Sequence, residues 1–285
     1  MNLNISYRGL LHSCNYSCHY CPMAMTSESK EQKEKDRAAL QDFFQWIVQH
    51  PQHRYRVLIT PWGEALVRRW YREKMIQLSH LSHVEQITAQ TNLSRKPDWL
   101  QDANKESLSL WVTYHPEQVS QAQFLQHIDQ LEALNVRYTV GMVGKPEYLE
   151  EINAMRSLLP EHRYLWVNAY RAKDKLYSQE MLEQLNQIDP HFDDNNCSYS
   201  SLNKACDGGE SSLFVNGHGD IHPCHFVDQK LTSIYDEHWE QKLAPQHCPN
   251  QECNCYIGYI HLRELNMNAK YGKQRLARIP IEFQN

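Results

Sequence analysis

The chain has 285 residues, of which 41% are hydrophobic and 22% are charged, and its formal net charge at neutral pH is −5. This composition is typical of a globular protein, and the acidic balance offers no general attraction to a phosphate backbone, so we expect no nucleic-acid partner. The sequence shows no secretory leader and no apolar run long enough to cross a bilayer, so we expect a cytoplasmic protein with no membrane partner.

Short buried apolar runs alternate with segments of helical periodicity over the first 170 residues. Strands are expected at residues 4–10, 56–60, 84–90, 108–113, 137–143 and 163–168, and helices at 29–49, 67–78, 96–104, 120–134 and 147–158. Such alternation predicts an α/β fold with a parallel sheet and right-handed crossovers. Periodicity alone does not distinguish a closed barrel from an open sheet.

The composition changes after Asp189-Pro190, where Asn, Gly, Ser, His and Cys become frequent and the alternation ends. We therefore expect two parts, residues 1–190 and a small cysteine-rich module at 191–285. Within the module, apolar residues flank an Asn216-Gly217 turn signal, which predicts a β-hairpin. This hairpin would bring Cys206 and Cys224 close enough to bind one metal centre.

Nine cysteines are present, and an odd number without a secretory leader indicates metal ligands rather than a disulfide framework. Cys14, Cys18 and Cys21 lie together after the first expected strand. Thiolates suit iron-sulfur clusters or zinc, and three of them leave one iron of a cubane cluster open. In a zinc site, His12 or His19 would have to supply a fourth ligand.

The spacing of Cys14, Cys18 and Cys21, with Tyr20 directly before the last, resembles the signature of the radical S-adenosylmethionine (SAM) superfamily. The resemblance implies a six-stranded partial (β/α) barrel and a [4Fe-4S] cluster whose open iron binds SAM. It further implies that an electron from the cluster cleaves SAM to a 5′-deoxyadenosyl radical, which abstracts a hydrogen atom from the substrate. An electron donor such as flavodoxin or ferredoxin would then be a partner.

The same resemblance assigns SAM contacts to the carboxyl ends of the strands, where α/β barrels bind their ligands. Gly63 and Glu64 match the family's Gly-Gly-Glu motif, which contacts the SAM amino group, and Trp62 replaces the first glycine. The other residues expected to bind SAM are Tyr20, Asn92, Thr113, His115 and Asn168. An ordinary turn or packing role is the alternative for each of them.

The hairpin, with Gly219 five residues before Cys224, resembles the auxiliary-cluster domains of SPASM and twitch radical SAM enzymes. This resemblance implies a second [4Fe-4S] cluster. Its expected ligands are Cys206, Cys224, Cys253 and Cys255, with Cys248 as the alternative for one of the last two. A structural zinc site is the competing interpretation. Cys197 stands apart, either as an ordinary thiol or as a hydrogen-atom donor to a product radical.

Together these features predict an enzyme that acts on a small molecule or a short peptide, with the auxiliary cluster aiding oxidation or substrate binding. The alternative is a non-catalytic zinc-binding interaction protein. The stretches at residues 61–66 and 224–226 also resemble those of a group of uncharacterised bacterial radical SAM proteins. That likeness indicates no substrate.

Overall fold

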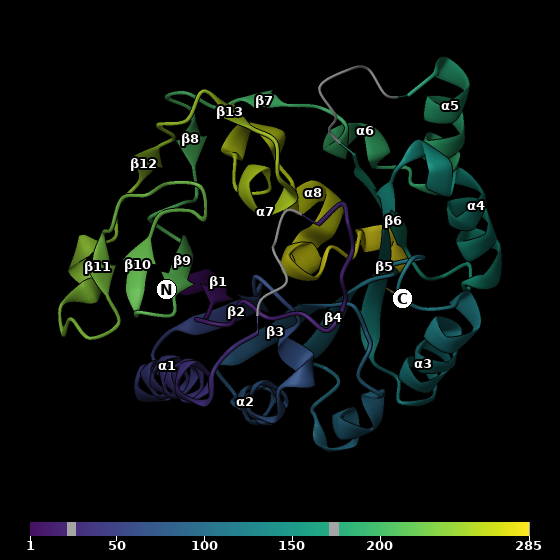
Figure 1. The fold of residues 1–285 in the computed structure, drawn as a ribbon. Helices are drawn as coiled ribbons and strands as arrows, with labels where there is room; N and C mark the ends of the chain where they lie inside the picture. Colours follow the sequence, from purple (N-terminus) through teal and green to yellow (C-terminus); the bar gives the residue numbers. More distant parts are fainter. Residues whose placement is uncertain (22–26, 171–176, 285) are drawn as a thin grey trace.

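The computed structural model describes residues 1–21, 27–170 and 177–284. Its main feature is a nine-stranded sheet with the order β11-β10-β9-β1-β2-β3-β4-β5-β6. Six strands are parallel neighbours in chain order: β1 (Asn2–Arg8), β2 (Arg54–Ile59), β3 (Val84–Thr91), β4 (Leu108–Thr113), β5 (Arg137–Gly144) and β6 (Leu165–Ala169). They confirm the predicted α/β class, and Figure 1 shows them curving around the C-terminal helices.

Helices connect the parallel strands and cover the outside of the curve (Figure 1). They are α1 (Lys30–Gln49), α2 (Arg69–Ser79), α3 (Gln121–Ala133), α4 (Leu149–Leu158) and α5 (Gln179–Ile188), with the 3-10 helices η1 (Ala65–Val67) and η3 (Pro146–Tyr148). α1 begins where Ser29 and Gln32 form a capping box, which satisfies backbone donors at the helix start. The helix predicted at residues 96–104 was wrong in type. It is the short 3-10 helix η2 (Pro97–Asp102), and such helices occur in pieces of this length.

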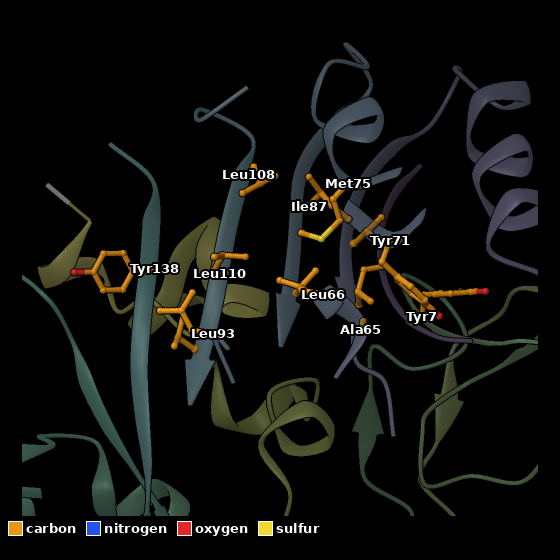
Figure 2. Packing of buried hydrophobic residues seen from close by; sticks show 14 of the residues in the cluster. Tyr7, Ala65, Leu66, Tyr71, Met75, Ile87, Leu93, Leu108, Leu110 and Tyr138 are labelled. Atoms are coloured by element: carbon orange, nitrogen blue, oxygen red, sulfur yellow. The ribbon is translucent and has the colours of Figure 1, made fainter. Parts of the chain in front are cut away.

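The main core fills the space between the sheet and these outer helices. Tyr7 of β1, Ile87 of β3 and Leu110 of β4 point toward Tyr71 and Met75 of α2 (Figure 2). All five are almost completely buried. Burying one large apolar side chain stabilises a fold by about 1.5–3 kcal/mol, so this layer fixes the strands whose ends form the site.

The predicted hairpin is present, as β9 (Ser212–Asn216) and β10 (Asp220–His222) pair antiparallel. β9 also pairs parallel with β1, and β11 (Thr232–Ser233) completes this edge. The sheet thus continues across residue 190, and the division there stays a prediction. The remaining elements are α6 (Phe192–Asn195), β7 (Tyr199–Ser200), β8 (Ala205–Cys206), η4 (Trp239–Lys242), β12 (Gln246–His247), β13 (Glu252–Cys253), α7 (Tyr256–Tyr259), η5 (Arg263–Leu265), α8 (Asn268–Tyr271), η6 (Gly272–Ala277) and η7 (Ile281–Phe283).

The C-terminal segment packs inside the curve of the sheet. Trp111 of β4 and Trp166 of β6 share a second buried cluster with Tyr256, Tyr271 and Leu276. Figure 1 shows α7 and α8 enclosed by the strands. Residues from the end of the chain therefore line the interior of the barrel. Among the described residues, no helix combines the length and apolarity needed to cross a membrane.

Candidate functional site

Two neighbouring cavities lie at the carboxyl ends of the parallel strands, where α/β barrels bind their ligands. The smaller, of about 420 Å³, is lined by the cysteine loop and the ends of β2, β3 and β4. The larger, of about 890 Å³, extends toward the C-terminal elements. Residues that line both are Cys21, Trp62, Gln90, Trp111, His115 and Trp166.

Cys14, Cys18 and Cys21 all line the smaller cavity, as the sequence predicts. The Asn92 side-chain amide donates to Cys14 Sγ at 3.8 Å, and Cys18 Sγ lies 3.4 Å from His115 Nδ1. Burial raises the pKa of the Cys14 thiol and raises that of Cys18 to about 11. A metal would displace the protons from these thiols. Three thiols with nearby N–H groups form a donor set that fits an iron-sulfur cluster.

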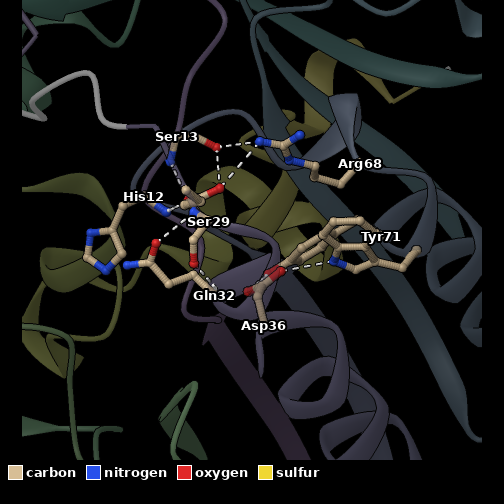
Figure 3. A network of polar contacts seen from close by, with 9 residues as sticks. His12, Ser13, Ser29, Gln32, Asp36, Arg68 and Tyr71 are labelled. Carbon is tan, nitrogen blue, oxygen red and sulfur yellow. Dashed lines mark hydrogen bonds and ion pairs between the residues drawn. The ribbon is translucent and has the colours of Figure 1, made fainter. Parts of the chain in front are cut away.

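His12, Ser13 and Arg68 lie together where the backbone leads into the cysteine loop (Figure 3), and the buried carboxylate of Glu28 holds them through hydrogen bonds. Its Oε1 accepts hydrogen bonds from the backbone N–H groups of His12 at 2.6 Å and Ser13 at 2.7 Å. Its Oε2 accepts from the Ser13 hydroxyl at 2.6 Å and from Arg68 at 3.3 Å. Burial alone would raise the pKa of Glu28, but the hydrogen bonds and the guanidinium lower it below its ordinary value.

Glu28→Gln is expected to destabilise the protein at pH 7 by about 1–3 kcal/mol, because one amide cannot accept all four bonds. Since folding lowers the pKa of Glu28, its stabilisation is present above the ordinary carboxyl pKa and is lost as pH falls through the lowered value. Thermal unfolding at pH 7 and below pH 4 checks this. An equal difference between wild type and variant at both pH values would contradict it.

Gly63 is required because the loop that follows β2 approaches the cysteine loop closely. A Cβ at this position would lie 1.8 Å from the Ser13 carbonyl oxygen, and the next residue, Glu64, donates its N–H to that oxygen at 3.0 Å. Trp62, which stands where the family has another glycine, is not among the residues with positive φ. Its side chain therefore causes no left-handed backbone strain.

Gly63→Ala is expected to push the two loops apart and to weaken the retention of iron at Cys14, Cys18 and Cys21. The clash is with backbone, so it cannot be relieved by a rotamer change, and overpacking of this kind costs about 1–3 kcal/mol. Iron content after anaerobic desalting measures the effect. The variant Gly272→Ala, at a glycine outside the lining of the three cavities, serves as the comparison for a general glycine effect. Full iron retention in Gly63→Ala would contradict the role.

The Glu64 carboxylate lies at the wall of the smaller cavity and is 3% exposed. Its Oε1 accepts from the Leu66 N–H and the Thr91 hydroxyl, both at 2.9 Å, and its Oε2 accepts from the Asn92 N–H at 2.6 Å. Burial raises the pKa of Glu64 to about 7, although these bonds oppose the shift. Because a carboxylate oxygen accepts two hydrogen bonds, Oε2 can still accept one from a ligand amino group.

The other predicted SAM contacts are divided between the two cavities. Thr113 and His115 line the smaller one. Tyr20 and the exposed Asn168 line the larger one, and the Tyr20 hydroxyl lies 2.7 Å from His115 Nδ1. Cys197 is not among the described residues that line these cavities. Its thiol donates to the Asp194 carbonyl at 3.4 Å, so its role as a hydrogen donor stays an unsupported prediction.

A third cavity, of about 110 Å³, gathers the C-terminal cysteines: Cys206, Cys224, Cys248, Cys253 and Cys255 all line it. Burial and neighbouring thiols raise the pKa values of Cys224 and Cys253 to about 12. Among the described residues, no three His, Cys, Asp or Glu side chains are arranged to hold a single metal ion. A cubane cluster is larger than one ion, and the donor set fits it because thiolates are its usual ligands.

Strand pairing brings Cys248 into this group. β12 pairs antiparallel with β8, with Gln246 opposite Cys206, and beyond this pair Cys248 donates its backbone N–H to the Lys204 carbonyl at 3.0 Å, two residues from Cys206. Charge on Cys248 raises the pKa of Cys206, Cys224 and Cys253 alike. Charge on Cys255 raises the pKa of Cys224 and Cys253. Cys255 also lines the larger cavity, where its charge opposes the lowering of the Arg8 pKa.

Several lining residues of the larger cavity were not predicted from the sequence: Arg8, Trp111, Trp166, His225 and Arg278. Arg8 ends β1 and follows the same strand-end rule that identified Glu64, so it could have been found. In the sequence, Trp111 and Trp166 are typical of core residues within their strands, so nothing marked them as cavity residues. Arg278 belongs to the C-terminal segment, which has no periodic pattern that would place it inside the barrel.

No protein-family model matches the chain, and no curated protein matches it. Solved structures do match. The structure "Native anSMEcpe with bound AdoMet" has a TM-score of 0.56 at 13% identity, covering 85% of this chain and 80% of that one. The structure of the same protein with AdoMet and Cp18Cys peptide has a TM-score of 0.55 at 14% identity, covering 98% and 89%. SuiB of Streptococcus suis has a TM-score of 0.57 at 14% identity, covering 86% and 66%.

At these identities the likeness establishes the fold. The fold is that of anSMEcpe and SuiB, and its parallel sheet agrees with the partial barrel that the cysteine motif implied. AdoMet, which is SAM, is bound in the anSMEcpe structures.

Proposed function

We propose that this protein is a cytoplasmic radical SAM enzyme that acts on a small molecule or a short peptide. The observation that carries the proposal is that Cys14, Cys18 and Cys21 share one cavity with Glu64 and Asn92 on a radical SAM fold. When bound, the cluster and SAM supply the radical chemistry: one electron splits SAM into methionine and a 5′-deoxyadenosyl radical, which takes a hydrogen atom from the substrate. An external donor such as flavodoxin or ferredoxin provides that electron.

The chain's own residues bind and orient SAM. Glu64 Oε2 would accept a hydrogen bond from the SAM amino group, because it retains one acceptor position in a buried site. Thr113 and His115 line the same cavity at the end of β4, where they would contact the ribose. Burial lowers the pKa of His115 to about 4, so this ring stays neutral and does not repel the sulfonium charge of SAM.

The C-terminal cysteines bind an auxiliary [4Fe-4S] cluster. We assign Cys206, Cys224, Cys248 and Cys253 as its ligands, because charge on Cys248 raises the pKa of the other three thiols, whereas charge on Cys255 raises that of Cys224 and Cys253. This assignment replaces Cys255 with Cys248 relative to the ligand set expected from the sequence. Cys255 then lies at the boundary between the auxiliary site and the larger cavity.

The substrate occupies the larger cavity, which adjoins the SAM cavity through Trp111 and His115. A short peptide stays among the candidates because anSMEcpe, which shares the fold, has been solved with a peptide bound. A small metabolite is the other candidate, because it would need only the larger cavity for its binding.

Anaerobic reconstitution with iron and sulfide tests the proposal. Two cubane clusters should give about eight iron and eight sulfide per chain and a charge-transfer band in the visible spectrum. Dithionite and SAM should then yield 5′-deoxyadenosine. Stoichiometric zinc without SAM cleavage would favour the zinc-binding interaction protein instead.

A further inference from the structure

The larger cavity is cationic. Among the described residues that line it, Arg8 and Arg278 are charged and none is an aspartate or a glutamate. Burial lowers the pKa of Arg8 to about 10, which leaves its guanidinium charged at neutral pH. Burial together with Arg8 lowers the pKa of His225 to about 3, and that ring stays neutral.

Arg278 is a charged group that the fold holds inside the barrel. It is 1% exposed, and its guanidinium lies 4.0 Å from the centre of the Trp166 ring and 4.3 Å from that of Tyr256. Its backbone adopts a left-handed φ of 54°, which is unfavourable for a residue with a side chain. No ion pair to Arg278 occurs within the described ranges. The charge of Arg278 lowers the pKa of Asp189. The carboxylate oxygens of Asp189, however, accept hydrogen bonds from Tyr164, Val167 and His191.

Three polar atoms of residues that line this cavity have no hydrogen-bond partner within the described ranges: Arg278 Nε, Trp166 Nε1 and His225 Nδ1. All three atoms are buried, so Arg278 and Trp166 each hold a buried N–H that lacks a partner in this part of the chain. Leaving such groups unpaired is costly, and a ligand that pairs with them recovers that energy. Two of the three carry N–H donors, so the missing partner is an acceptor.

Arg8 presents the second guanidinium. Its Nε donates to the Thr60 carbonyl at 2.8 Å, and its guanidinium lies 3.9 Å from the centre of the Trp62 ring. These contacts leave terminal N–H groups for a ligand, since a guanidinium has five donors in all. Each arginine lies against aromatic rings of the same cavity, Arg8 against Trp62 and Arg278 against Trp111 and Trp166, and these rings provide an apolar surface for the body of the ligand.

We propose that the substrate is an organic anion, with a carboxylate or a phosphate group bound by Arg278 and Arg8 and an apolar or planar body against the tryptophans. Charge-assisted bonds from guanidinium to such oxygens are among the stronger hydrogen bonds in proteins. That the bound anion is the substrate rests on the proposed function, whereas the anion site itself is tested by binding alone.

The test is calorimetric titration of the anaerobically reconstituted protein, with saturating SAM, by phenylacetate, phenyl phosphate and phenylacetamide. The amide has the shape of phenylacetate without the charge. We expect at least one anion to bind about tenfold or more tightly than the amide, as loss of one bond to a charged group implies. Preference for phenylacetate or for phenyl phosphate identifies which anionic group the site takes.

Variants assign the effect to the arginines. Arg278→Met should weaken binding of the preferred anion about tenfold, and Arg278→Lys should restore part of it because the charge returns without the planar fork. Arg37→Gln removes the same charge from the exposed face of α1 and should leave binding unchanged. Circular dichroism checks that Arg278→Met folds. If it does not fold, anion binding by Arg8→Met and the comparison with the amide on the unmodified protein decide whether the cavity binds anions through its arginines.

Equal binding of the amide and the anions, or undiminished binding in Arg278→Met and Arg8→Met, would overturn the inference. Loss of anion binding whenever SAM is present would also overturn it, because the arginines would then serve SAM. Absence of 5′-deoxyadenosine with intact anion binding would refute the proposed function while leaving the anion site standing.

Discussion

Replacing Cys14, Cys18 and Cys21 together by alanine is expected to abolish SAM cleavage and to lower the iron content from about eight to about four atoms per chain. The three thiols line the cavity that contains Glu64, so without them no iron is held where SAM binds. Iron and sulfide analysis, together with chromatographic detection of 5′-deoxyadenosine, measures both effects.

Cys197→Ala serves as the control for loss of a cysteine as such. Cys197 lies at the Asp194 carbonyl rather than among the described residues that line the cavities, so this variant should retain all the iron. SAM cleavage at the level of the unmodified protein in the triple variant would show that these cysteines are not the ligands.

The Cys206→Ala, Cys224→Ala double variant is expected to lose the other half of the iron, leaving about four atoms per chain. Both thiols line the C-terminal cavity, and each lies within the electrostatic influence of Cys248. The cluster at Cys14, Cys18 and Cys21 should remain, because it is built from a separate loop. SAM cleavage in the absence of substrate should therefore persist, and electron paramagnetic resonance should show one reduced cluster instead of two.

Two single variants decide the fourth ligand. Cys248→Ala should lower the iron content to the level of the double variant, because Cys248 lines the same cavity as Cys206 and its charge raises the pKa of that thiol. Cys255→Ala should keep about eight iron atoms. The reverse result would restore Cys255 as a ligand and exclude Cys248, and unchanged iron in the double variant would reject an auxiliary cluster at this place.

Local signals in the sequence were sufficient for the alternation of strands and helices. β4 occupies the predicted residues, Leu108–Thr113, and α1, Lys30–Gln49, matches the helix expected at residues 29–49. Strand periodicity, apolar spacing and capping all depend on residues within a few positions of one another. The cysteine spacing is also local, and so the sequence alone identified the loop and, through its resemblance, the fold.

The partners of distant residues were decided only by the tertiary structure. Nothing near Ser212–Asn216 indicates that this strand pairs with β1, and nothing near Cys248 indicates that it shares a cavity with Cys206. Arg278 enters the barrel because the C-terminal segment packs on Trp111 and Trp166. Such contacts depend on packing between segments far apart in the chain, which leaves no periodic trace in either one. The sequence therefore determined which loop and strand ends form the proposed SAM site, and the tertiary structure decided which distant residues surround the neighbouring cavity.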